Sequence, residues 1–328
     1  MRHQKNNQVG FTLIELMIAI VLGLLITAAA MQLFMGGSLS YRLQQNVAEV
    51  QDGGIFGVDY ITQQIQLANY GNADYLALTD QTPRGGIVFT SGLANTANVN
   101  ITNLVDSKKI ENTYLSQSAG AAGWTGLSNT NTASDQLTIQ FIAPVDMFNC
   151  EGEKVIKGDR IVQRYFLRSY RSEATDDANV ASLGLACDAN DPNELVNVSA
   201  TPTDLRGFGI ATQSGQIIIP RVDQFKVQVL AKSGPNYHYY TLNEYREAAI
   251  ANRAATPALD APEIQLIKLA VLVRSQTKTE TNAINPAKSF VMLGDTVTLK
   301  TASSGNSNRY AREVYETTIS LRNGYKEL

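Results

Sequence analysis

The chain has 328 residues, 44% of them hydrophobic, which is enough to bury a substantial core in one large domain or two smaller ones. Its formal net charge is −3 and its lysines and arginines do not cluster, so nucleic acid is a poor candidate for a partner. The two cysteines, Cys150 and Cys187, are too few for a disulfide-rich scaffold and lack the spacing of a metal site, which leaves a single bridge as the possible pairing.

The N-terminal segment changes abruptly from polar to apolar. Residues 1–10, MRHQKNNQVG, include Arg2 and Lys5, whereas residues 11–35 contain no lysine or arginine. Because an α-helix rises about 1.5 Å per residue, residues 11–35 are long enough to cross a hydrocarbon core of about 30 Å. Positive residues precede this segment, and the next one is Arg42, which predicts a transmembrane helix with a cytoplasmic N-terminus.

Glu15 lies inside this apolar segment and is the only charged residue between Lys5 and Arg42. A charged side chain at the centre of a membrane helix costs about 2.5 to 3.5 kcal/mol, so a carboxylate in this position needs a partner or a function. One interpretation is structural, since the side chain can reach the membrane interface and favours the positive end of the helix dipole. The other interpretation is that it neutralises a cation.

The sequence GFTLIE at residues 10–15 resembles the class III signal of type IV prepilins and pseudopilins. In that family a membrane-embedded prepilin peptidase cuts after the glycine and methylates the new N-terminus. The resemblance implies cleavage between Gly10 and Phe11, N-methylation of Phe11, and a role for Glu15 in assembly.

The chemistry of these residues agrees with that role. Cleavage before Phe11 would create an α-amine that is largely protonated at neutral pH and lies where the membrane disfavours charge. Glu15 follows four residues later, so its carboxylate can neutralise this amine on its own helix or on a neighbouring subunit. Gly10 has no side chain and would expose the scissile peptide to a narrow peptidase site.

A secretory signal peptide is the competing interpretation, because Ala28, Ala29 and Ala30 offer an A-x-A cleavage site. The apolar part of such signals spans only about 7 to 15 residues, however, which is shorter than residues 11–35. The mature N-terminus separates the two: Phe11 for a prepilin and Met31 for a secreted protein.

Residues 36–71 have apolar side chains at steps of three and four, which predicts an amphipathic extension of the same helix that ends at Gly71. The pair Gly53-Gly54 either permits bending or allows another element to pack closely. Residues 72–328 change to a period of two, so we predict an α+β protein whose long N-terminal helix packs on a mainly antiparallel β-sheet domain. The predicted strands are residues 86–90, 136–143, 160–170, 216–231, 263–274, 289–300 and 313–322.

Two polar stretches, residues 91–134 and residues 172–204, are predicted to be long excursions from the sheet. Cys187 lies in the second. Both cysteines would face the oxidising side of the membrane, where a Cys150–Cys187 bridge would stabilise the fold by about 4 kcal/mol and attach the second excursion to the sheet.

The sequence does not indicate an enzyme. His238, within Tyr237-His238-Tyr239-Tyr240, is the one histidine outside residues 1–10, and no nucleophile elbow, P-loop, HExxH or dinucleotide motif accompanies it. We expect a surface or half-buried aromatic strand here, although with Tyr245 it is also a possible contact for sugars or a partner. The oxygen donors Asp188, Asn190, Asp191 and Glu194 resemble a calcium loop of some pseudopilins but miss the EF-hand pattern. We predict no metal, no cofactor and no small-molecule substrate.

The rest of the chain resembles the PilW family of minor pilins. The resemblance lies in LQQNVAEVQ at residues 43–51, IQLANYG at residues 65–71 and YETTISLRN at residues 315–323. Members often carry an arginine near the position of Gly53-Gly54 and a cysteine shortly after that of Gly71, and this chain has neither.

The family implies an inner-membrane subunit of a Gram-negative bacterium that joins other minor pilins, the major pilin and the inner-membrane assembly platform, and that primes a fibre and sits at its tip. A J-type pseudopilin of type II secretion remains an alternative. So does a tip adhesin that binds a surface through residues 91–134 or through the tyrosine cluster around His238.

Overall fold

The computed structural model describes residues 10, 12–72, 77–90, 103–104, 110–119, 125–170, 180–191, 205, 215–279, 284–285, 287–300 and 309–321. The chain divides into two compact units, Met1–Asn46 and Val47–Leu328. A single long helix, α1 (Leu13–Ile65), begins in the first unit and ends in the second.

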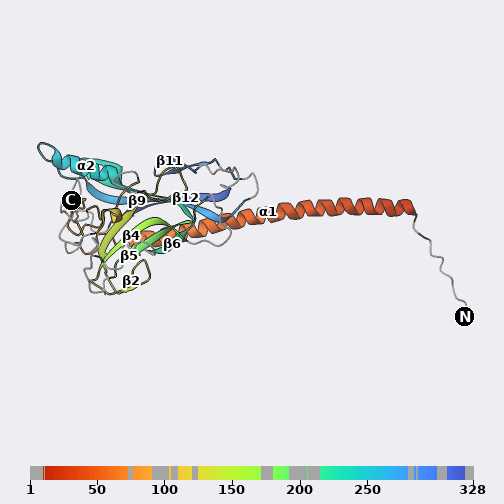
Figure 1. Cartoon of the computed structure of the whole chain (residues 1–328), viewed down its shortest axis with the longest axis horizontal. Coiled ribbons are helices and arrows are strands. Elements are labelled where there is room, and N and C mark those ends of the chain that lie inside the picture. Colours follow the sequence, from red (N-terminus) through yellow and green to blue (C-terminus); the bar gives the residue numbers. More distant parts are fainter. Residues whose placement is uncertain are drawn as a thin grey trace. The chain divides into compact units, whose positions relative to one another are not determined.

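The first unit consists of the apolar part of α1, drawn in red in Figure 1. All side chains from residue 12 to residue 37 are exposed. Among the helices of the described ranges, α1 is the one long and apolar enough to cross a membrane. Because so large an apolar surface is not stable against water, this segment requires lipid or other protein around it.

The second part of α1 packs in the core of the second unit through Val50, Ile61 and Ile65, which are buried. A Cβ atom at Gly54 would overlap the ring of Tyr315. Of the two interpretations of the Gly53-Gly54 pair, the structure therefore supports close packing at Gly54.

The helix ends at Ile65 and not, as predicted, at Gly71. Residues 66–71 form tight turns, and two of them, Asn69 (φ 67°) and Gly71 (φ 83°), have left-handed backbone conformations that a helix cannot continue through. Asn69 donates its N–H to the carbonyl of Gln140 at 3.1 Å, while its side chain accepts from the N–H of Gly86 at 3.1 Å. The chain leaves the helix early because these contacts join it to the sheet.

The second unit is built on two four-stranded antiparallel sheets, which confirms the predicted architecture. The first sheet has the order β1-β4-β5-β6, and the second has the order β12-β9-β7-β8. The bounds in the first sheet are β1 (Leu137–Ile142), β4 (Arg160–Ser169), β5 (Leu183–Ala189) and β6 (Gln216–Pro220). Those in the second are β7 (Val222–Ser233), β8 (Asn236–Thr241), β9 (Glu263–Lys278) and β12 (Tyr310–Ser320).

Smaller elements complete the unit. They are the hairpins β2 (Met147–Phe148) with β3 (Lys154–Val155) and β10 (Ser289–Met292) with β11 (Asp295–Thr298), the 3-10 turn η2 (Asn112–Tyr114), and the helix α2 (Leu242–Ala254). The predicted strands at residues 86–90, 216–231 and 289–300 are wrong in detail. Residues 86–90 contain one isolated bridge, between Ile87 and Ile139. The other two predicted strands are broken by left-handed residues at Arg221 and at Leu293, so that β6 and β7 enter different sheets and β10 and β11 form a hairpin.

The main core lies between α1 and both sheets. In β7, Phe225, Val227 and Val229 are buried while Lys226 and Gln228 are partly exposed, which confirms the predicted alternation. Part of the outer face of the second sheet is covered by the β10–β11 hairpin, whose Phe290 and Met292 pack on this face.

Asp135 attaches the segment before β1 to the second sheet. Its two carboxylate oxygens accept the N–H of Val227 at 2.8 Å and the N–H of Ala119 at 3.2 Å. Burial raises the pKa of this carboxyl from 3.8 to about 6, against the lowering effect of these hydrogen bonds. The folded chain therefore holds this proton more tightly than the unfolded chain does.

The raised pKa predicts a pH-dependent stability difference. Between about pH 4 and pH 6 the folded state binds more protons at Asp135, so this residue's contribution to the free energy of unfolding falls as pH rises, by up to about 3 kcal/mol. Asp135→Asn removes this titration. We compare the free energies of unfolding in urea of the wild-type protein and the variant from pH 4 to pH 7. The difference between them should shift in favour of the variant as pH rises. A constant difference would contradict the raised pKa of Asp135. The exposed Asp146, changed to asparagine, is the control.

Candidate functional site

The first turn of α1 is closed by a reciprocal pair of contacts between Thr12 and Glu15. The backbone N–H of Thr12 donates to Oε2 of Glu15 at 3.0 Å, and the hydroxyl of Thr12 donates to the same oxygen at 3.0 Å. In return, the N–H of Glu15 donates to the Thr12 hydroxyl at 3.3 Å. This is a capping box, so the carboxylate satisfies donors at the helix start that would otherwise lack partners.

These contacts leave the second carboxylate oxygen available. The two hydrogen bonds that the Glu15 carboxylate accepts both end on Oε2, and Oε1 makes no hydrogen bond to any described residue. A cation at the helix start can therefore be neutralised without breaking the capping box. The structural and functional interpretations of Glu15 are compatible.

Gly10 lies directly before this turn and is exposed. A Cβ atom placed on it would meet nothing within 4 Å, so the fold of this chain does not itself require glycine there. Any requirement for a small residue would come from an enzyme that binds this peptide. Phe11 and residues 1–9 lie outside the described residues.

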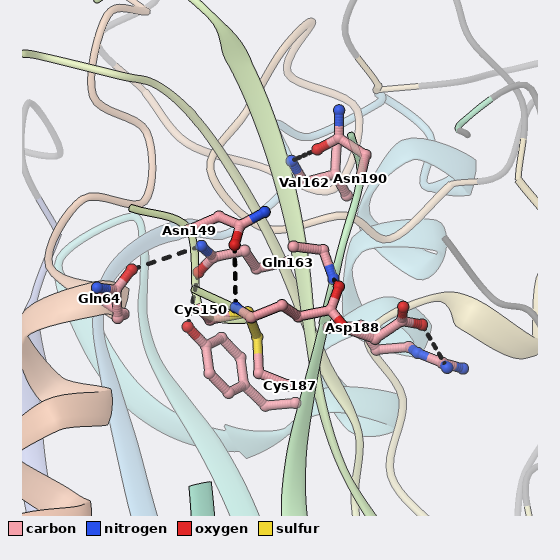
Figure 2. The surroundings of a disulfide bond; sticks show 12 residues. Gln64, Asn149, Cys150, Val162, Gln163, Cys187, Asp188 and Asn190 are labelled. Atoms are coloured by element: carbon pink, nitrogen blue, oxygen red, sulfur yellow. Dashed lines mark hydrogen bonds and ion pairs between the residues drawn. A yellow bond between two sulfur atoms is a disulfide. The ribbon is translucent and has the colours of Figure 1, made fainter. Parts of the chain in front are cut away.

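The second predicted feature, the bridge between Cys150 and Cys187, is present (Figure 2). Its Cα atoms are 6.0 Å apart, and it joins the turn after β2 to the middle of β5. Asn149 holds that turn by accepting the N–H groups of Glu151 and Glu153, at 3.0 and 2.9 Å. Closing a loop of this length stabilises by about 4 kcal/mol in the chain-entropy model.

Comparison with known protein families bears on both ends of the chain. The model of the prokaryotic N-terminal methylation motif matches residues 5–31, which include Gly10, Thr12 and Glu15. The model of the type IV pilus-assembly protein W, PilW, matches residues 190–323. The chain is a type IV pilin-like protein with a PilW domain at residues 190–323. Its methylation motif and its apolar helix indicate a membrane-anchored, pilus-related minor pilin.

The PilW match coincides with one part of the fold. Residues 190–323 contain β6 to β12 and α2, and thus the whole second sheet. The match includes residues 315–323, one of the segments in which the sequence resembles the family. It does not include the other two segments, at residues 43–51 and 65–71. A type IV pilin-like protein is expected to contact other pilins and the assembly machinery in general.

The chain was also compared with curated proteins and with solved structures. No curated protein matches this chain significantly. Among solved structures, a type IV-like pilin from Thermus thermophilus aligns with 84% of this chain and 98% of its own, at 10% identity and a TM-score of 0.36. The family assignment depends on the two sequence models.

The oxygen donors considered for calcium have other contacts in this minor pilin. Asp188 lies in β5, buried, with its carboxylate 2.7 Å from Nη2 of Arg164. Asn190 accepts the N–H of Val162 at 2.6 Å (Figure 2). It also donates to the carbonyl of Arg160 at 3.1 Å. Glu194 lies outside the described residues. The polar excursion predicted at residues 172–204 is therefore wrong for residues 183–189, which form a buried strand.

The aromatic residues considered as a binding cluster are divided between surface and core. Tyr237, His238 and Tyr239 are exposed on β8, as expected for an aromatic surface strand. Tyr245 is instead buried in α2 and donates its hydroxyl to the carbonyl of Pro262 at 2.8 Å. It packs on Phe89, with ring centroids 5.1 Å apart, and belongs to the core.

Thr12 is the one residue of the N-terminal site that the sequence analysis missed. The signal was present, because Thr12 precedes Glu15 by three residues, as in the S/T-x-x-E pattern of a capping box.

Proposed function

We propose that prepilin peptidase cuts this minor pilin between Gly10 and Phe11 and that Phe11 becomes its N-methylated N-terminus. The methylation motif over residues 5–31, which includes the capped start of an exposed apolar helix, supports this processing. The protein would comprise a leader at residues 1–10, a transmembrane segment at residues 11–35, an amphipathic extension at residues 36–71 and a β-rich domain at residues 72–328.

Oε1 of Glu15, which makes no hydrogen bond to any described residue, supports a role in assembly. After cleavage, the positive amine of Phe11 would lie within one helical turn of Glu15, or would meet the Glu15 of an adjacent subunit. Pairing removes two charges from the membrane, since each is costly there alone. The subunit would thereby pass from lipid into a fibre of stacked helices.

An exposed apolar patch farther along α1 supports the same arrangement. Ile55 and Phe56 lie in the part of the helix that belongs to the second unit, yet their side chains are 56% and 71% exposed. Neighbouring helices in a fibre would cover these side chains. Tyr60, one turn after Phe56, is also partly exposed on this side.

The proposed role is to prime fibre assembly, together with other minor pilins, at the tip of a type IV pilus. The chain would start as a single-pass protein of the inner membrane of a Gram-negative bacterium, with its N-terminus in the cytoplasm, and would move to the cell surface. Its partners would be the peptidase, the other minor pilins, the major pilin and the assembly platform. It would act as a structural subunit without catalysis.

Deletion of the chain from cells that still make the major pilin tests this role. We expect few or no surface fibres, because nucleation is lost, and we expect the wild-type chain to restore them. Normal fibres with lost adhesion would instead support an adhesin. Normal fibres with lost protein secretion would support a J-type pseudopilin of type II secretion. Electron microscopy, an adhesion assay and measurement of secreted protein distinguish these outcomes.

A further inference from the structure

The strand β8 lies at one edge of the second sheet. Among the described strands it pairs with β7 alone, in register from Gln228 opposite Thr241 to Ser233 opposite Asn236. Natural edge strands are commonly protected against further pairing by lysines, prolines or bulges. The sequence of β8, NYHYYT, has no lysine and no proline, and its pairing with β7 has no register shift.

The turn into β8 determines which backbone groups face outward. In a two-residue hairpin the residues flanking the turn exchange hydrogen bonds, and bonded and non-bonded pairs then alternate. With Gly234 and Pro235 in the turn, Asn236, His238 and Tyr240 bond to β7. The N–H and C=O groups of Tyr237 and Tyr239 therefore face the open edge, and no hydrogen bond from them to other described segments is present.

The side chains beside this edge add charge. Tyr237 and Tyr239 are 58% and 44% exposed, and they share one face of the sheet with Lys232 and Lys268. The ammonium of Lys232 lies 5.9 Å from the centroid of the Tyr237 ring, and that of Lys268 lies 5.3 Å from the centroid of Tyr239. Neither lysine has a salt bridge among the described residues.

We propose that β8 is a docking edge for an extended acidic segment of a partner protein, which adds to the second sheet as a further strand. Main-chain hydrogen bonds to Tyr237 and Tyr239 would supply affinity, and acidic side chains at alternate positions would meet Lys232 and Lys268. A second copy of this chain is disfavoured, because pairing β8 with β8 would bring two sets of lysines to the same edge. This edge is distinct from the N-terminal helix, so its test does not depend on the proposed processing.

A binding experiment with the full chain in detergent tests the proposal. The probes are a synthetic peptide that alternates glutamate with valine and a matched peptide that alternates lysine with valine. Binding is measured by fluorescence anisotropy, and hydrogen exchange locates the protected amides. We expect the glutamate peptide to bind and to protect the amides of Tyr237 and Tyr239.

Charge reversal supplies the matched variants. The double change Lys232→Glu with Lys268→Glu is expected to lower the affinity for the glutamate peptide by at least about tenfold. It is also expected to create binding of the lysine peptide. Lys157→Glu makes the same charge reversal at a single exposed site on the turn after β3. It should change the binding of neither peptide. The gain of lysine-peptide binding shows that the double variant is folded.

Four results would overturn the proposal. They are equal binding of both peptides, protection confined to other strands, dimerisation of the full chain through β8, and binding of neither peptide.

Discussion

Replacing Glu15 with glutamine is expected to leave cleavage after Gly10 intact and to exclude the chain from fibres. Glutamine preserves the capping box with Thr12, since an N3 glutamine can replace the glutamate, but it cannot neutralise an amine. An unpaired charge at a membrane helix centre costs about 2.5 to 3.5 kcal/mol, which sets an upper bound of a few hundredfold on the loss of assembly. The measurement is the amount of the chain in sheared fibres relative to the amount of processed chain in the membrane.

The matched variant is Thr12→Ala, which removes the hydroxyl of the capping box and retains the carboxylate. Loss of an N-cap side chain costs about 1 kcal/mol of helix stability, so we expect this variant to enter fibres. Glu15→Ala removes both functions and should behave like Glu15→Gln. If Glu15→Gln assembled normally and Thr12→Ala failed, Glu15 would act only as a helix cap.

The largest loss of stability is expected for Asp223→Asn. Asp223 is buried in β7 between two buried arginines, with Nε of Arg274 3.2 Å from Oδ1 and Nε of Arg312 2.6 Å from Oδ2. Nδ2 of Asn129 donates to Oδ1 at 2.7 Å. The change would leave two buried cations without their counter-charge, at a cost of about 3 to 5 kcal/mol in the free energy of unfolding. Because the group links β7, β9 and β12, the whole second sheet would be affected.

The control for this variant is Asp295→Asn. Asp295 forms an ion pair with Lys226 at 2.7 Å, a distance similar to that of the Asp223–Arg312 pair, but its side chain is 55% exposed. Such pairs contribute about 0 to 1 kcal/mol. Urea unfolding of the two variants should therefore separate by several kcal/mol, and equal losses would contradict the assignment of Asp223 as the centre of a buried ionic group.

The elements predicted correctly from the sequence are those with a strong local period. The uninterrupted apolar segment of α1 is the pattern of a membrane helix. The alternation of apolar and polar residues in β7 is the pattern of a sheet with one face in water. The methylation motif was recognised for a similar reason, since Gly10, Phe11 and Glu15 are close in sequence and match it without any tertiary contact.

The elements that were missed lack such a period or depend on distant contacts. All residues of β5 are buried, and it contains Gly184, Ala186 and Ala189, so no alternation marks it as a strand. The division of residues 216–231 between two sheets depends on a left-handed conformation at Arg221, which its residue type does not predict. The start of α2 was recognisable, because Thr241 and Glu244 form a capping box there.

The proposed carboxylate–amine pair at the start of α1 is tested most directly by mass spectrometry of the mature chain isolated from cells. We predict that it begins with N-methylated Phe11. A chain that retains Met1, or one that begins at Met31, would have no amine one helical turn from Glu15 and would contradict the proposed mode of assembly.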